Sequence, residues 1–454
     1  MLKEDLSRLK IKNRRVLIEL IAILNYLADN NNDSLQRKIN FIKSIHLDVL
    51  EKVFLTPSGR QWIFITYAFI KNDQIGKALL ENYSDWLGIS SRNLEKQLIK
   101  KLDEFIFSLI ITSRQVPDFI FSLDANSEIF FREIHGYWKL NDHDEIHITP
   151  ETIIEYQIDH NVLTLSLSGK NIQELSFSKL PGSSKFPLFI DLHSEASRAS
   201  FNGREQLPRV SRNDFNIIRS QIAIVEHALK YIEDVDESIY KYFKEHPNYF
   251  VPLIGPEGSL PSSSNSSIDT MFWYSITDQP LLVSEMIIHE LSHQRLFRLQ
   301  DEDPLIDSES YGSGWNECNY YSPWRDDARP INGVFHGFIV FSEVSTFWLK
   351  LIMRNRLDEK DRNIAERRMT MLGFQLSLAK DTLNECRFTS KGEKLLEEYT
   401  WNLQESILPF IKNHNLGEMQ PFFMEFHDQN ELVLGQSISE IVQDHRKQWL
   451  LRNG

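Results

Sequence analysis

The segment from Ile288 to His293 places two imidazoles and one carboxylate within one short stretch, Ile-His-Glu-Leu-Ser-His. If the segment is helical, residues four apart point to one face, so His289 and His293 can present two ring nitrogens to a single metal ion. Glu290 lies about a hundred degrees round the helix, from where it reaches a metal-bound water instead of the metal. Two surface histidines would have the same spacing, but this pair lies on an apolar face, which favours the metal site.

Catalytic metal sites usually have three protein ligands, and the chain offers two candidates for the third. The metzincin pattern requires Gly at position 296 and His at 299, whereas Leu296 and Leu299 stand there, which excludes that class. His336 and Glu343 are seven residues apart on a predicted helix, so two turns bring both to one face. His336 would complete a three-histidine site, and Glu343 would complete the ligand set of a gluzincin-type zinc peptidase.

Two arginines, Arg325 and Arg329, stand between these candidate ligands in an aromatic, proline-bounded segment over residues 320–330. The arginine guanidinium is a planar group of donors that matches a carboxylate in a bidentate manner. One interpretation is therefore a carboxylate-binding loop beside the metal site. An alternative is that these arginines pair with Asp326, Asp327 or the end of a helix.

The elements that must position these residues are mainly helical. Helical periodicity is predicted for residues 1–115, 211–246, 281–298, 333–356 and from 359 onward. Short antiparallel strands are predicted around residues 127–134 and 161–168, and a polar serine-rich loop over 261–267 precedes a short strand over 271–275. The predicted fold class is α+β, mainly helical with a smaller antiparallel sheet and a metal site between the H-E-x-x-H helix and a downstream helix.

The chain is predicted to divide into three parts. Residues 1–115 form a helical N-terminal region, 116–205 a β-rich middle region, and 206–454 a helical domain that contains the metal-binding motif.

Composition excludes several functional classes. The chain has 454 residues, of which 41% are hydrophobic, and a formal net charge of -14. The negative charge disfavours nucleic acid and favours a basic or neutral peptide as partner. Two cysteines without a C-x-x-C exclude a disulfide scaffold and a thiolate zinc site, and they favour a reducing, cytoplasmic compartment. The most apolar N-terminal run, residues 16–24, contains Glu19 and is too short to span a membrane. No small-residue cleavage site follows it, so an export signal is not expected.

Residues 250–350 together resemble the H-E-x-x-H-type peptide β-hydroxylases, a family associated with ribosomally synthesised and post-translationally modified peptides. The resemblance depends on the order and spacing of four motifs, which are much more specific than H-E-x-x-H alone. These are the serine-rich loop and strand over 262–275, the motif at 289–293, Tyr321-Ser-Pro-Trp-Arg325 with Arg329-Pro330, and Gly333-Val-Phe-His336-Gly337.

The resemblance implies an Fe(II)- and 2-oxoglutarate-dependent dioxygenase that uses O2 to hydroxylate a side-chain β-carbon of a precursor peptide, which it could bind through a leader sequence. It implies that His289, His293 and His336 are the metal ligands and that Arg325 and Arg329 bind the carboxylate of 2-oxoglutarate. Glu290 would then have no hydrolytic role and would orient a ligand or a bound water.

Three alternatives stay open. In a zinc metallopeptidase, His289, His293 and Glu343 would bind Zn(II) and Glu290 would act as the general base. A rival iron site would use His143, Glu145 and His193, although the charged segment around the first two favours a solvated loop. The third alternative is a non-catalytic peptide-binding protein.

Overall fold

The computed structural model describes the larger part of the chain. The described residues are 2–29, 33–72, 94–123, 128–131, 135–139, 146–159, 162–168, 173–192, 207–211, 213–256, 260–311, 317, 319–325, 327–419 and 437–453. The rival iron site falls outside them, because His143, Glu145 and His193 are not among the described residues.

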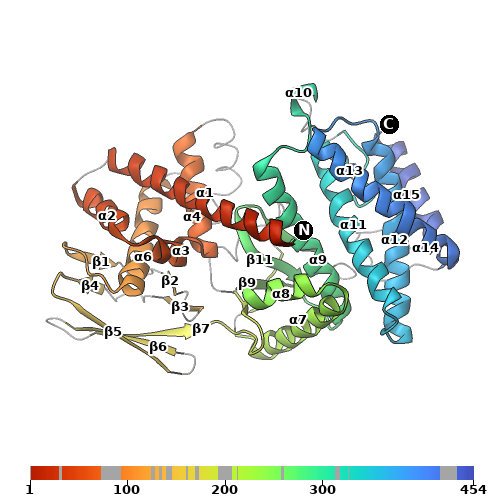
Figure 1. The fold of residues 1–454 in the computed structure, drawn as a ribbon. Coiled ribbons are helices and arrows are strands. Elements are labelled where there is room, and N and C mark those ends of the chain that lie inside the picture. The colour runs from red at the N-terminus through yellow and green to blue at the C-terminus, as the bar shows by residue number, and fades with distance from the viewer. Residues whose placement is uncertain are drawn as a thin grey trace.

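Helices form the N-terminal part of the protein (Figure 1). They are α1 (Leu2–Asp29), α2 (Asp33–Ser44), α3 (Leu47–Phe54), α4 (Pro57–Lys71) and α6 (Leu94–Ser113). Helix α4 begins where the sequence provides a strong start signal: Thr56 accepts a hydrogen bond from the backbone N–H of Gly59, and Pro57 occupies the first turn.

Antiparallel strands follow these helices. A two-stranded sheet pairs β1 (Phe121–Leu123) with β4 (Ile146–Ile148). A five-stranded antiparallel sheet has the order β2-β3-β7-β6-β5. Its strands are β2 (Glu128–Phe131), β3 (Gly136–Lys139), β5 (Ile153–Asp159), β6 (Val162–Ser168) and β7 (Gln173–Lys179). The strands of these two sheets are therefore antiparallel, as the sequence pattern predicts for residues 127–134 and 161–168.

A third sheet lies beside the helices of the C-terminal part and differs from the prediction. Its order is β10-β11-β9-β8, with β11 parallel to β9 and β9 parallel to β8, so this sheet is mixed rather than antiparallel. Its strands are β8 (Leu188–Ile190), β9 (Asn248–Leu253), β10 (Ser262–Asn265) and β11 (Ile268–Ser275). The serine-rich segment predicted as a loop contains β10, because its backbone pairs with β11.

The C-terminal part is helical and contains the two helices that bear the candidate ligands. Its helices and helical turns are α7 (Phe215–Val235), α8 (Glu237–Glu245), α9 (Pro280–Glu302), α10 (Ser308–Tyr311), α11 (Ile331–Met353), α12 (Glu359–Leu383), α13 (Ser390–Asn402), a π-helical turn (Leu403–Ile407), α14 (Leu408–Asn413), a 3-10 turn (Leu416–Glu418) and α15 (Ile438–Asn453).

Helices α9 and α11 pack against each other (Figure 1). Pro280 stands in the first turn of α9, where its missing N–H is not needed. Among the described residues, α11 alone is long and apolar enough to cross a membrane, but 72% of its apolar window is buried inside the protein. Burial on most sides is the property of a core helix.

Among the described residues, two large hydrophobic cores and one small cluster are present, and the two large cores group most of the buried residues. One joins the N-terminal helices to β1, β2, β4 and β6, and the other joins β8, β9 and β11 to the C-terminal helices. The cores thus group the strands differently from the predicted boundaries at 115 and 205, because β8 belongs with the C-terminal part. The three-part division itself stays a prediction.

The N-terminal helix α1 lies against α9 through charged side chains. Arg8 Nε is 3.1 Å from Glu302 Oε2. Buried Asp269 on β11 lies 3.4 Å from Lys12 Nζ and 3.2 Å from Arg298 Nη1. Because removing one partner of a buried ion pair is costly, these contacts fix the N-terminal part against α9.

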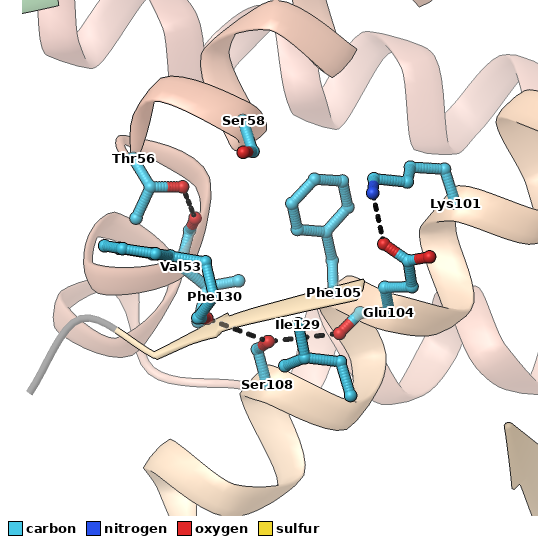
Figure 2. A pocket seen from close by; sticks show the side chains of 9 residues that line it. All are labelled: Val53, Thr56, Ser58, Lys101, Glu104, Phe105, Ser108, Ile129 and Phe130. Carbon is cyan, nitrogen blue, oxygen red and sulfur yellow. Dashed lines mark hydrogen bonds and ion pairs between the residues drawn. The ribbon is translucent and has the colours of Figure 1, made fainter. Parts of the chain in front are cut away.

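The small pocket in Figure 2 lies in the N-terminal part, between α3, α4, α6 and β2. Its volume is about 10 Å³, which is close to the space of a single water molecule. The polar side chains around it bond within the protein: Ser108 Oγ donates to the carbonyl of Glu104 at 3.1 Å, and Lys101 forms an ion pair with the Glu104 carboxylate. This pocket is too small to bind a substrate.

Candidate metal centre

The two histidines of the H-E-x-x-H motif lie on one face of α9, as predicted. Their Nε2 atoms are 3.2 Å apart and their ring centroids are 4.8 Å apart. Two nitrogen ligands, each about 2.1 Å from one metal ion at an angle of about 90–110°, are about 3.0–3.4 Å apart. The separation of the two Nε2 atoms therefore falls within the range for two ligands of one metal, and it is also the length of a hydrogen bond between two imidazoles.

His336 lies beside this pair but has another partner. It is 7% exposed on α11, and its ring stacks on that of His293 with the centroids 5.9 Å apart. Its Nε2 is 2.7 Å from Gln300 Oε1, and Gln300 Nε2 donates to Asn332 Oδ1 at 3.1 Å. Among the residues that the structure describes, no group of three or more His, Cys, Asp or Glu side chains is arranged to hold a metal ion. The three-histidine metal site therefore stays a prediction.

Glu343, the alternative third ligand, faces elsewhere. Its carboxylate accepts a hydrogen bond from the hydroxyl of Tyr399 on α13. It lines a cavity together with Arg295, and none of the three histidines lines that cavity. The helical spacing that places His336 and Glu343 on one face of α11 is therefore not sufficient to bring both to the histidine pair.

Burial keeps the three imidazoles neutral. It lowers the pKa of His293 to about 4 and that of His336 to about 3, and for His336 the nearby His293 adds to the effect. The pKa of His289 is also far below its usual value, first through burial and then through the charges of His293, Arg368 and Arg325. A neutral imidazole is the form that binds metal, so the site needs no deprotonation at pH 7.

Glu290 is buried beside His289, and none of the described residues gives it a cationic partner. It is 2% exposed, and its Oε1 accepts a hydrogen bond from Ser262 Oγ at 2.6 Å and lies 4.0 Å from His289 Nε2. Its Oε2 is buried without a hydrogen-bond partner among the described residues. Burial raises the pKa of Glu290 to about 7, although the Ser262 and Ser264 hydroxyls lower it. Such a carboxyl can hold or release a proton near neutral pH.

The aromatic, arginine-containing segment reaches α11 through Trp324. Its indole stacks on Phe341, with centroids 4.8 Å apart, and Phe341 in turn contacts the ring of His289. The indole also lies against Gly337, where a Cβ atom would come within 2.8 Å of it. Only a residue without a side chain allows this approach, so Gly337 and Trp324 together position the segment.

The structure separates the two arginines of this segment. The charge of Arg325 reaches His289, where it contributes to the lowered pKa of the imidazole. Arg329 Nη1 lies 3.4 Å from Asp327 Oδ2, and its backbone pairs with that of Tyr320. The pairing interpretation therefore holds for Arg329, and carboxylate binding by Arg325 stays a prediction.

Sequence analysis missed a buried ion pair one turn before the motif. Glu285 on α9 is 2% exposed, and both of its oxygens accept hydrogen bonds from Arg368 on α12, at 2.7–3.0 Å. Trp348 Nε1 on α11 donates to Glu285 Oε2 at 2.9 Å. These bonds hold three helices around the start of the motif. A carboxylate inside an apolar helical run was the available signal, because such a group requires a buried partner.

No protein-family model matches the chain, and no curated protein is significantly similar to it. The resemblance to the peptide β-hydroxylases thus depends on the motifs alone.

Substituting Gly337 by alanine is expected to lower the free energy of unfolding by about 1–3 kcal/mol, because the added Cβ would overlap the Trp324 indole. Gly333, one turn earlier on α11, is the matched control, since its nearest neighbours to such a Cβ are 3.7 Å away. Alanine there should be neutral or stabilise by up to about 1 kcal/mol. Urea unfolding of both variants tests this, and equal effects would contradict the packing of Trp324 on Gly337.

Proposed function

We propose that the chain is an Fe(II)- and 2-oxoglutarate-dependent hydroxylase that modifies a side-chain β-carbon of a precursor peptide. The observation that carries the proposal is the histidine pair with Nε2 atoms 3.2 Å apart, beside a third buried histidine and within reach of the Arg325 charge. Imidazoles suit Fe(II), and a cationic guanidinium suits the carboxylate of a keto acid.

His289 and His293 would hold the metal in their present positions. His336 would become the third ligand by exchanging its hydrogen bond with Gln300 for the metal. When bound, Fe(II) and 2-oxoglutarate together supply the oxidising chemistry that activates O2 for hydroxylation. The protein contributes neutral imidazoles, a cation for the keto acid, and the Phe341 and Trp324 rings that exclude water from one side of His289.

Glu290 serves this site by holding a proton. Its Oε1 is fixed by Ser262 on β10, and no cation among the described residues pairs with it. A carboxyl of this kind orients a bound water or substrate group and exchanges a proton with it.

A precursor peptide is the proposed partner, and the cytoplasm the proposed compartment. The net charge of -14 favours a basic or neutral peptide over an acidic one.

A zinc metallopeptidase is the second candidate, favoured by Glu290. Its buried carboxylate lies 4.0 Å from His289 Nε2 and has a pKa of about 7, which suits a general base. The peptidase also requires Glu343 as a ligand, and the hydrogen bond from Tyr399 holds that carboxylate in the separate cavity. This contact makes the hydroxylase the better supported function.

Mass spectrometry of basic or neutral peptides, incubated aerobically with the chain, Fe(II) and 2-oxoglutarate, tests the proposal. A hydroxylase adds one oxygen atom to the peptide and forms succinate in step. Cleavage of the peptide backbone without added oxygen would contradict it and favour the peptidase.

Replacing Arg325 by glutamine is expected to weaken 2-oxoglutarate binding by about 10-fold or more, because a charge-assisted hydrogen bond to the carboxylate is lost. Lysine at this position should restore only part of the affinity, since it lacks the bidentate geometry. Arg329→Gln is the matched control and should have a smaller effect, because Arg329 is paired with Asp327. Anaerobic titration of the Fe(II)-loaded variants with 2-oxoglutarate measures these affinities. A larger loss of affinity in Arg329→Gln than in Arg325→Gln would contradict the assignment of Arg325 as the residue that binds the carboxylate.

A further inference from the structure

A cavity of about 340 Å³ lies between α1, α9, α11 and α13, and none of the three histidines lines it. Its volume is within the range of small-molecule sites, which is about 300–1,000 Å³. Ser292 of the motif does line it, but the three proposed ligands do not, so the proposed function leaves the cavity without a role.

One side of the cavity is aliphatic. Leu296 on α9 and Ile339 on α11 line it and are only 3% and 4% exposed. Leu299 on α9 and Leu395 on α13 extend this surface. The wall suits an aliphatic group of the size of a leucine side chain, whose burial removes apolar surface from water.

The other side carries charges of both signs. Arg295 on α9 and Glu343 on α11 line the cavity with Tyr399, and Arg8 and Glu398 stand at its α1 and α13 sides. Burial and the Glu343 carboxylate raise the pKa of Tyr399 well above its usual value, whereas Arg295 lowers it. Arg295 and Glu343 thus both lie within electrostatic reach of one hydroxyl.

This combination limits the chemistry of a ligand. A wholly apolar molecule would take the arginine and glutamate groups out of water without compensation. A simple anion would meet the Glu343 and Glu398 carboxylates as well as the arginines. A molecule with one positive group, one negative group and a short aliphatic chain can satisfy both walls.

We infer that the cavity binds a free aliphatic α-amino acid. Its carboxylate accepts hydrogen bonds from Arg295, its ammonium group donates to Glu343, and its side chain packs on the aliphatic wall. A peptide terminus presents only one of the two charges and is therefore disfavoured.

Isothermal titration calorimetry of the full chain with L-leucine tests this inference. L-leucine should bind. N-acetyl-L-leucine mimics a peptide C-terminus and L-leucinamide mimics an N-terminus, and each should bind at least about 10-fold more weakly. Arg295→Gln should weaken the binding of L-leucine but leave the affinity for L-leucinamide unchanged. Lack of L-leucine binding at millimolar concentration, or equal binding of either analogue, would overturn the inference.

A substitution that fills the cavity provides a second test of the inference. Leu395→Trp should abolish L-leucine binding, whereas Leu450→Trp, at an exposed position of α15, should leave it intact. Thermal unfolding confirms that both variants are folded, and a folded Leu395→Trp variant that binds L-leucine normally would place the site elsewhere. His289→Ala should bind L-leucine with unchanged affinity, so this inference and the proposed hydroxylase fail or succeed separately.

Discussion

Replacing His289 by alanine is expected to lower the affinity for Fe(II) by at least about 100-fold. Loss of a residue that only supports a ligand costs about 10–100-fold, so loss of a ligand itself should cost more. His293→Ala should behave in the same way, because the two Nε2 atoms lie 3.2 Å apart and face one position. Metal titration under anaerobic conditions, with cobalt absorption as a second readout, measures the effect.

Two controls separate ligand loss from general damage. His227, an exposed histidine on α7, should tolerate alanine without a change in metal affinity. Glu343→Gln should also leave metal affinity unchanged, because its carboxylate is bonded to Tyr399. A large loss of affinity in Glu343→Gln with none in His336→Ala would contradict the three-histidine site and favour the zinc peptidase.

Substituting Arg368 by methionine is expected to lower the free energy of unfolding by about 3–5 kcal/mol, because it leaves the Glu285 carboxylate buried without its cation. The double variant Glu285→Leu with Arg368→Met should recover much of this loss, since no unpaired charge is left. Arg356→Met is the matched control: Arg356 pairs with Asp234 at the surface, and its loss should cost less than about 1 kcal/mol.

Urea unfolding of the unsubstituted protein and of the three variants measures these differences in the free energy of unfolding. A loss below about 1 kcal/mol in Arg368→Met would show that the carboxylate is solvated or protonated when its partner is removed. The single variant should also weaken metal binding, because Glu285 lies one turn before His289 on the same helix.

The parts of the site that depend on local geometry were predictable. Residues four apart on a helix share a face whatever surrounds them, so the positions of His289 and His293 follow from the sequence. The helix of Glu343 was equally predictable, but the direction of its carboxylate was not. That direction depends on Tyr399, which lies on another helix and is 56 residues away in the chain.

The same limit applies to the sheet and to the third histidine. The serine-rich segment has no strand pattern of its own, and β10 forms because its backbone pairs with β11. The parallel pairing of β9 with β11 joins distant segments, which periodicity does not reveal. The contact of His336 with Gln300 likewise depends on how α9 and α11 pack.

The most direct test of the proposed metal centre is an anaerobic titration of the Fe(II)-loaded chain with 2-oxoglutarate, followed by the visible charge-transfer absorption of an iron-chelated 2-oxo acid. We expect the band to appear at one equivalent of metal, to be absent in His289→Ala and His293→Ala, and to require more 2-oxoglutarate in Arg325→Gln. A chain that binds Fe(II) through these histidines yet develops no such band, or one that keeps the band in both alanine variants, would contradict the account.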